Sequence, residues 1–251
     1  MFYKKYGDGQ PVILLPGLIG GEWIWDKNVD YLVENGCEVY VITPTAPEVF
    51  SQGWKDSRLK IDRIIVENDL EQVAIVGNSL GSIIAMDYVC HNSDAIGLLV
   101  ISGAVARQGN SGYNQLLKPE EALQAFNEKN RAFGRSIIEQ VFFDKSKIPW
   151  EREDQLYHIF DKIADPALRW LVLMQQFDVQ KVIKKIECPI LMLWGKEDFI
   201  TPIQPWMSQL NSIQNLQGLH VFEECGHCPM IELPGEFNQL LYESLPTSIH
   251  T

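Results

Sequence analysis

Ser79 is the serine whose sequence neighbours most clearly indicate a catalytic role. It lies in the run GNSLG at residues 77–81, and this run fits the pattern G-x-S-x-G. A β-branched run at 73–76 precedes it, and a segment of helical periodicity begins at Leu80. At such a strand-to-helix turn the serine hydroxyl projects beyond the strand ends, and small flanking residues let the chain reverse tightly. The backbone N–H of Leu80, at the helix N-terminus, would face negative charge forming on an attacked carbonyl. We therefore predict that Ser79 is a nucleophile.

A serine hydroxyl needs a base to act as a nucleophile at neutral pH, and the base needs an orienting carboxylate. Asp198 follows the predicted strand at 190–195, and His227 alone among the five histidines lies just past the last predicted strand, at 219–222. Functional groups of an open α/β sheet gather beyond the carboxyl ends of its strands, so we expect the three side chains to meet there. Glu197 is the neighbouring alternative to Asp198, and the turn pattern favours Asp198.

Two cysteines flank the predicted base, because residues 225–228 read Cys-Gly-His-Cys and fit C-x-x-C. That pattern is typical of disulfide-exchange sites, where it opens a helix after the first strands of a small thioredoxin-like unit. Here it lies near the C-terminus, after the last predicted strand, with Pro229 directly behind it. The sequence holds no second cysteine pair at zinc-ligand spacing. We therefore expect neither thiol redox chemistry nor a metal at this motif.

The elements that must position these residues alternate between short β-branched runs and helical segments over residues 11–103. This alternation is typical of a parallel sheet flanked by helices. The stub before Val12 leaves room for only one short strand at that edge of the sheet. The predicted strands are residues 12–15, 38–43, 73–76, 96–102, 190–195 and 219–222, and the predicted helices are 25–35, 56–68, 80–90 and 234–245.

The pattern changes between about Val105 and Lys185, where periodicity is helical and no convincing strand occurs. Helix formers dominate at 119–126 and 165–174. We therefore predict an α/β fold with a mostly parallel, doubly wound sheet in residues 1–104 and 186–251, interrupted by an all-helical cap in residues 105–185. The aromatic residues of the insertion, which include Trp150, Trp170 and Phe177, can be interpreted in two ways. They either belong to the hydrophobic core or form the wall of a pocket.

The composition is that of a folded domain, because 46% of the 251 residues are hydrophobic and 22% are charged. The net charge of −12 repels phosphate backbones and anionic lipid, so nucleic acid is not an expected partner. The N-terminus lacks the apolar run of a signal peptide, and no apolar stretch reaches membrane-spanning length. Most of the five cysteines, an odd number, are expected to be reduced thiols. We therefore expect a cytoplasmic protein without stable membrane insertion.

Together these motifs make the sequence resemble the α/β-hydrolase family over nearly the whole chain. The elbow at 77–81, the turn WGKED at 194–198 and the Gly-His turn at 226–227 match the family's nucleophile, acid and base positions. The resemblance implies a triad of Ser79, Asp198 and His227. The family's early loop usually reads His-Gly, whereas this chain has Pro-Gly at 16–17. The resemblance places one backbone oxyanion donor there, the N–H of Leu18, and the other at Leu80.

The resemblance also implies a function, which is a cofactor-independent serine hydrolase acting on a small, largely apolar substrate. The bond cleaved would be a carboxylic ester or a related acyl or C–C bond. In this family a helical cap roofs the pocket above the serine, and an aromatic roof suits an apolar acyl or ring group. The alternative is a non-hydrolytic small-molecule receptor or a lyase on the same scaffold, because fold does not fix function. The oligomeric state stays open.

Overall fold

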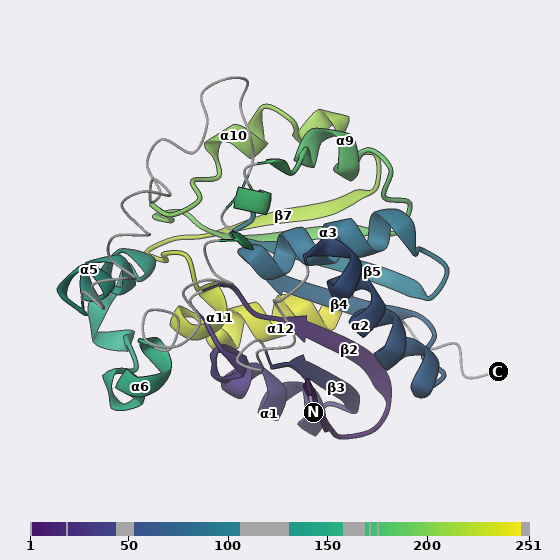
Figure 1. Ribbon diagram of the computed structural model, residues 1–251, viewed down its shortest axis with the longest axis horizontal. Helices are drawn as coiled ribbons and strands as arrows, with labels where there is room; N and C mark the ends of the chain where they lie inside the picture. Colours follow the sequence, from purple (N-terminus) through teal and green to yellow (C-terminus); the bar gives the residue numbers. More distant parts are fainter. Residues whose placement is uncertain are drawn as a thin grey trace.

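A seven-stranded sheet forms the centre of the computed structural model, with strand order β1-β3-β2-β4-β5-β6-β7 (Figure 1). Every neighbouring pair is parallel except β1 and β3, which are antiparallel. The strands are β1 Tyr3–Tyr6, β2 Gln10–Leu15, β3 Cys37–Ile42, β4 Val73–Asn78, β5 Ile96–Ser102, β6 Ile190–Gly195 and β7 Leu216–Phe222. The structure describes residues 2–18, 20–43, 53–105, 131–157, 169–170, 172–174 and 176–246.

The mostly parallel, doubly wound sheet predicted from the sequence is confirmed. All six predicted strands are present, and the N-terminal stub supplies β1, a four-residue edge strand. Hydrophobic side chains alternate between the two faces of the sheet, so that in β2 Val12 and Leu14 belong to one core cluster while Ile13 and Leu15 belong to the other. Because both faces are buried, the central strands are continuously apolar rather than alternating with polar residues.

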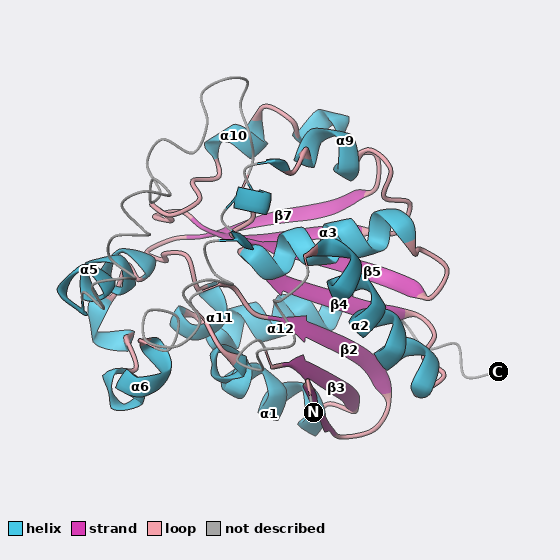
Figure 2. Ribbon diagram, viewed as in Figure 1, coloured by secondary structure: helices cyan, strands magenta, loops and turns pink. Residues whose placement is uncertain are grey.

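Helices cover both faces of the sheet (Figure 2). One core cluster joins the sheet to α1, α11 and α12, and the other joins it to α2, α3, α9 and α10. Helix α3 begins directly after Ser79 and is almost wholly buried, which explains why it has no polar face. The helices are α1 Asp26–Glu34, α2 Trp54–Glu67, α3 Leu80–His91, α5 Arg131–Val141, α6 Glu153–Leu156, α9 Val179–Ile183, α10 Gln204–Met207, α11 Pro229–Glu232 and α12 Pro234–Ser244.

The described part of the insertion contains helices and short 3₁₀ turns and no strand. Helices α5 and α6 lie beyond the carboxyl ends of the strands (Figure 1). Their buried residues, such as Ile138 and Leu156, join the core cluster of α1 and α12. The predicted helix at 119–126 lies outside the described residues, and the one at 165–174 is described only in part.

The later part of the insertion packs on the opposite face of the sheet. Trp170 is fully buried and contacts Trp54, at the start of α2, edge to face with ring centroids 4.8 Å apart. Phe177 lies 5.0 Å from the same ring and is also buried. Val179 of α9 belongs to the same cluster. For Trp170 and Phe177 the structure therefore supports the core reading, since their rings fill the interior between the insertion and α2.

Two glycines on neighbouring strands differ in how much space surrounds them. A Cβ on Gly195 would overlap the carbonyl oxygen of Gly226, whereas a Cβ on Gly218 would meet only a methyl group of Leu191, at 3.6 Å. The backbones of the turns after β6 and β7 therefore touch at Gly195.

We expect Gly195→Ala to lower the free energy of unfolding by about 1–3 kcal/mol, because the new methyl group forces two backbones apart. Gly218→Ala is the matched control on β7 and should leave that free energy unchanged or slightly raised, because alanine has less backbone entropy to lose. Urea unfolding followed by circular dichroism measures both values. Equal stability of the two variants would show that the turns do not depend on this contact.

Candidate active site

Ser79 occupies a strained turn between β4 and α3. Its backbone has φ +55° and ψ −117°, a conformation that side chains rarely adopt. The turn is held by the N–H of Ser79, which donates to the carbonyl of Ser102 at 2.8 Å. Side chains on the flanking glycines have no room, because a Cβ on Gly77 would overlap the backbone of Ser82 and one on Gly81 would overlap that of Leu15. The G-x-S-x-G run thus folds as a sharp strand-to-helix turn, as expected.

Asp198 and His227 meet in a buried contact. The Nδ1 of His227 lies 2.8 Å from the Oδ2 of Asp198, and the two side chains are 6% and 1% exposed. A carboxylate can only accept, so Nδ1 is the donor in this hydrogen bond, and in the tautomer with a single ring proton Nε2 is then the acceptor. That tautomer is the one a general base requires.

The turn after β6, residues 196–201, is called the acid turn here, and its backbone N–H groups hold the side chain of Asp198. The Oδ1 of Asp198 accepts hydrogen bonds from the N–H groups of Ile200 at 2.9 Å and Thr201 at 2.8 Å. The hydroxyl of Thr201 lies 2.8 Å from Oδ2, 2.9 Å from the carbonyl oxygen of Gly103 and 3.1 Å from the Nδ1 of His227. Thr201 was not predicted from the sequence, although the hydrogen bonds of Asp198 to the N–H groups two and three residues further on form a common local turn. The carboxylate is therefore held in one orientation.

The turn after β7, residues 223–228, is called the histidine turn here, and it lies directly against the turn that carries Ser79. Asn78, which precedes the serine, donates from Nδ2 to the carbonyl oxygen of His227 at 3.1 Å. Gly103, at the end of β5, has φ +58°, and a Cβ there would approach the imidazole Cε1 to 2.7 Å. The structure thus brings the turns after β4, β5, β6 and β7 together at one edge of the sheet, and it places Ser79, Asp198 and His227 on three of them.

The loop after β2 also reaches the serine. A Cβ on Gly17 would lie 3.1 Å from the Cβ of Ser79, so the backbone of this loop passes beside the serine side chain. Leu18 follows directly, and Leu80 is the first residue of α3, where a backbone N–H has no partner within the helix. The two predicted oxyanion donors therefore belong to segments that flank Ser79 on both sides.

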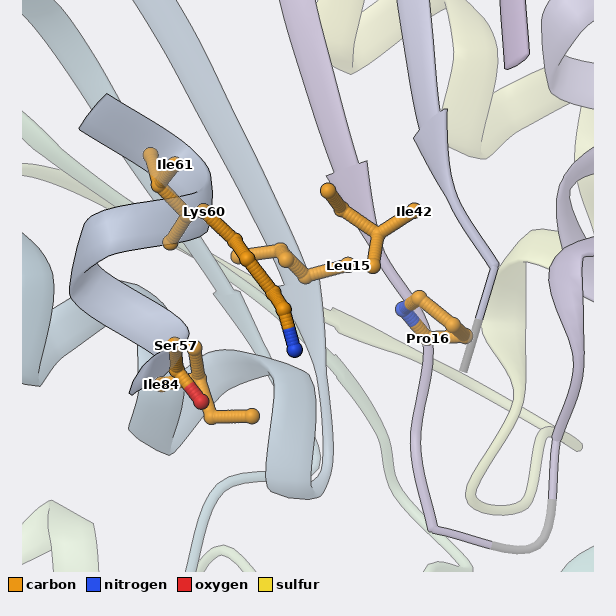
Figure 3. Close-up of a pocket in the computed structure, with 7 residues that line it drawn as sticks. All are labelled: Leu15, Pro16, Ile42, Ser57, Lys60, Ile61 and Ile84. Atoms are coloured by element: carbon orange, nitrogen blue, oxygen red, sulfur yellow. The ribbon is translucent and has the colours of Figure 1, made fainter. Parts of the chain in front are cut away.

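Pro16 takes the place of the usual histidine and lies at the carboxyl end of β2. It lines a small cavity with apolar side chains of β2, β3, α2 and α3, across which the Lys60 side chain extends (Figure 3). The cavity volume is about 20 Å³. That volume holds about one water molecule and is far below the roughly 300 Å³ of a small-molecule site. We conclude that Pro16 packs against apolar neighbours rather than extending a hydrogen-bond network.

Glu197, the alternative carboxylate, has a different partner from Asp198. Its Oε2 accepts the N–H of Cys225 at 3.0 Å, and its own N–H donates to the carbonyl of Cys225 at 2.9 Å. Glu197 thus ties the acid turn to the histidine turn without contacting the imidazole. The expected assignment of the imidazole contact to Asp198 agrees with this geometry.

The two cysteines that flank His227 are buried free thiols. Burial is the main cause that raises the pKa of Cys225, and the carboxylates of Glu232 and Asp198 raise it further. Burial also raises the pKa of Cys228 well above its ordinary value. A disulfide-exchange cysteine needs the opposite shift, toward the thiolate. Within the described residues, no group of three histidine, cysteine or carboxylate side chains is arranged to hold a metal, and no helix is long and apolar enough to cross a membrane.

Comparison with known proteins places this sequence and fold in a known family. A profile of the alpha/beta hydrolase family matches residues 12–240. The chain therefore belongs to the alpha/beta hydrolase family of enzymes.

Relatives of known activity include two hydrolases. The 2-hydroxy-6-oxononadienedioate/2-hydroxy-6-oxononatrienedioate hydrolase of Paraburkholderia xenovorans is 24% identical over 98% of this chain and 90% of that protein. The 2-hydroxy-6-oxo-6-phenylhexa-2,4-dienoate hydrolase of Comamonas testosteroni is 23% identical over 97% of this chain and 90% of that protein.

Solved structures share the fold. An esterase from Exiguobacterium antarcticum matches with a TM-score of 0.80 at 20% identity, over 97% of this chain and 94% of that one. A meta-cleavage product hydrolase from Pseudomonas fluorescens matches with a TM-score of 0.72 at 21% identity, over 96% and 92% of the two chains. At these identities the likeness concerns the fold alone.

We expect the thiols of Cys225 and Cys228 to resist alkylation in the folded protein, because burial keeps them protonated and out of contact with reagent. Iodoacetamide at neutral pH, followed by peptide mass spectrometry, should leave both unmodified in the native state and modify both in urea. Cys90 is only partly buried and serves as the internal control. Rapid native alkylation of Cys225 or Cys228 would revive the thiol-redox alternative.

Proposed function

We propose that this protein is a cofactor-independent serine hydrolase in which Ser79 is the nucleophile, His227 the base and Asp198 the orienting acid. Its substrate would be a small, largely apolar molecule with a carboxylic ester or a related acyl or C–C bond. The observation that carries the proposal is the buried contact of 2.8 Å between His227 Nδ1 and Asp198 Oδ2, beside a serine held in a strained turn.

The reaction follows from the tautomer and the surrounding donors. Ser79 Oγ attacks the substrate carbonyl carbon and its proton passes to Nε2 of His227, while Asp198 stabilises the imidazolium. The negative charge that develops on the carbonyl oxygen is held by the backbone N–H groups of Leu18 and Leu80. When the tetrahedral intermediate collapses, the leaving group takes the proton from His227. A water molecule, deprotonated by His227, then hydrolyses the acyl-enzyme and frees Ser79.

The buried environment supports this chemistry. Asp198 and His227 are shielded from water, so the charges that form during the reaction interact in a medium of low effective dielectric constant. The carboxylate is already oriented by the N–H groups of Ile200 and Thr201, and no further ordering is needed when the imidazolium forms. Such preorganised groups are the usual source of the largest catalytic contribution.

We also propose that residues 105–185 form a cap over the site. In support, the early described part of the insertion joins the core cluster on one face of the sheet, and the later part joins the cluster on the other face. The described anchors thus lie on both faces of the sheet, and helices α5 and α6 lie beyond the carboxyl ends of the strands, the edge where Ser79 lies. Phe143 is exposed and lies two residues after the end of α5, where its backbone is close to the histidine turn. Phe199 is also exposed and follows Asp198 directly.

The relatives favour two bond types. The curated relatives are named for the hydrolysis of dienoic keto acids, and one structural neighbour is an esterase. In both cases the bond that is cleaved is joined to a carbonyl carbon, which a serine hydroxyl can attack, so the geometry is compatible with either. A receptor or a lyase without hydrolysis remains the rival function on this scaffold.

The first test of this proposal is covalent labelling and turnover at Ser79. A fluorophosphonate probe should label wild type at Ser79, and Ser79→Ala should abolish both labelling and hydrolysis, on the order of a 10⁶-fold loss of kcat. The substrates are p-nitrophenyl esters of increasing chain length, a thioester, and a 2-hydroxy-6-oxo-dienoate.

The results of these labelling and turnover assays also distinguish between the possible functions. Hydrolysis of the esters identifies an esterase, whereas cleavage of the dienoate alone identifies a C–C hydrolase. Wild type that neither reacts with the probe nor turns over any substrate would support the receptor. Labelling that survives in Ser79→Ala would reject Ser79.

Asp198 and Glu197 are adjacent carboxylates with different partners, so they form a matched pair. Asp198→Asn should lower kcat about 10⁴-fold, because an amide at this position favours the wrong tautomer of the imidazole. Glu197→Gln removes one charged contact to the Cys225 N–H and should cost less than about tenfold in kcat. Steady-state kinetics on the best substrate, with circular dichroism to check folding, measures both. A larger loss in Glu197→Gln than in Asp198→Asn would reverse the assignment.

A further inference from the structure

Helix α11 ends in a buried carboxylate that the proposed triad does not use. Glu232 is 2% exposed, although burying a charge is costly unless hydrogen bonds compensate it. Burial raises the pKa of Glu232, and the backbone N–H groups around its carboxylate oppose that rise. A buried carboxyl group in such a place has to be explained by the groups that it holds.

Glu232 joins two segments that are far apart in the sequence. Its Oε1 accepts the N–H of Gly226 at 2.8 Å, and its Oε2 accepts the N–H groups of Phe143 and Asp144, each at 3.0 Å. The Gly226 peptide immediately precedes His227. Phe143 and Asp144 belong to the insertion, just after the end of α5. One side chain therefore links the backbone of the histidine turn to the first described part of the insertion.

Other contacts leave the histidine turn little freedom. The N–H of His227 donates to the carbonyl of Val141 at 2.8 Å, and its carbonyl accepts from Asn78 at 3.1 Å. A Cβ on Gly226 would lie 2.6 Å from the carbonyl oxygen of Val141 and 2.9 Å from the Oε1 of Glu232. The turn is thus enclosed by the insertion on one side and Glu232 on the other. The Glu232 carboxylate accepts the N–H of Gly226, and that of Glu197 accepts the preceding N–H of Cys225.

We propose that Glu232 is a positioning residue, which holds the backbone of the His227 turn against residues 141–144 so that the imidazole stays aligned with Asp198 and Ser79. The proposal rests on the proposed function of the triad. Glutamine at position 232 keeps the shape of the side chain, but its NH₂ group must face one of the two sets of N–H donors. At least one hydrogen bond is then lost, and the turn is released on that side.

The experiment compares wild type with Glu232→Gln in three measurements. We expect kcat to fall about tenfold to a hundredfold, as a small misplacement of a catalytic group does, while KM changes much less. The rate of Ser79 labelling by the fluorophosphonate should fall in parallel. The low-field proton resonance of His227 Nδ1–H, which reports its hydrogen bond to Asp198, should shift or broaden.

A matched control separates positioning from stability. Asn238 on α12 is buried, accepts a hydrogen bond from Asn28 at 2.6 Å and donates to the carbonyl of Lys27 at 3.0 Å, and neither partner belongs to the histidine turn. Asn238→Ala should lower the unfolding midpoint in urea without changing the labelling rate or the resonance. If Glu232→Gln does not fold, Glu232→Asp is used instead, since it keeps the charge but cannot reach both segments.

The outcomes distinguish this inference from the proposed function. A folded Glu232 variant with the kcat, labelling rate and resonance of wild type would overturn the positioning role while leaving the triad intact. Loss of all three measurements in Asn238→Ala as well would show a general effect of stability, and would also overturn it. Wild type that is not labelled at Ser79 contradicts the proposed function itself.

Discussion

The site depends on the direct contact of four chain turns at the carboxyl edge of the sheet. These turns follow β4, β5, β6 and β7, and their backbones approach so closely that a side chain at the contact points would overlap a neighbour. Gly195 meets the turn of Gly226, and Gly103 meets the ring of His227. Parallel strands bring their carboxyl ends to one edge, but only residues without a Cβ allow the turns beyond them to touch.

Hydrogen bonds then make this arrangement unique. Asn78 fixes the carbonyl of His227, Asp198 fixes its imidazole, and the hydroxyl of Thr201 lies between Asp198 and the carbonyl of Gly103. These groups are buried, so each lost partner would leave a polar atom without water to replace it. The network therefore opposes any slip of one turn relative to the others, and stability and alignment have the same cause. The strain at Ser79 is compensated by these surrounding contacts.

Much of the fold could be predicted because the strong signals are local. The β-branched runs specified the strands, and the run at 77–81 specified its own backbone conformation. Glu232 was not predicted, because it accepts backbone N–H groups of distant segments, and the sequence does not show which peptides come together. Thr201 was not predicted, because its contacts with Gly103 and His227 join residues that are far apart in the sequence. The helix α11 has only four residues, too few for a hydrophobic period to show.

The aromatic residues of the insertion illustrate a different limit of prediction from sequence. A tryptophan that fills a core and one that lines a pocket have the same sequence signature, and only packing separates them. Trp170 is fully buried against Trp54, whereas Phe143 and Phe199 are exposed beside the turns of His227 and Asp198. Hydrophobic character alone therefore does not identify the wall of a substrate pocket.

The choice between ester and C–C cleavage lies outside the three proposed catalytic side chains. Both reactions need a nucleophile, a base and an oxyanion site, and they differ in the group that leaves the carbonyl carbon. An alkoxide accepts the proton of His227 directly, whereas a carbon leaving group must first be stabilised by delocalisation into the rest of the substrate. The residues that would recognise the leaving group therefore lie outside the three proposed catalytic side chains. The exposed Phe143 and Phe199 are candidates, because they lie beside the turns of His227 and Asp198. Since the insertion is anchored to the backbone of the proposed base through Val141 and Glu232, we expect substitutions that change specificity in that segment to affect the alignment of the proposed catalytic groups as well.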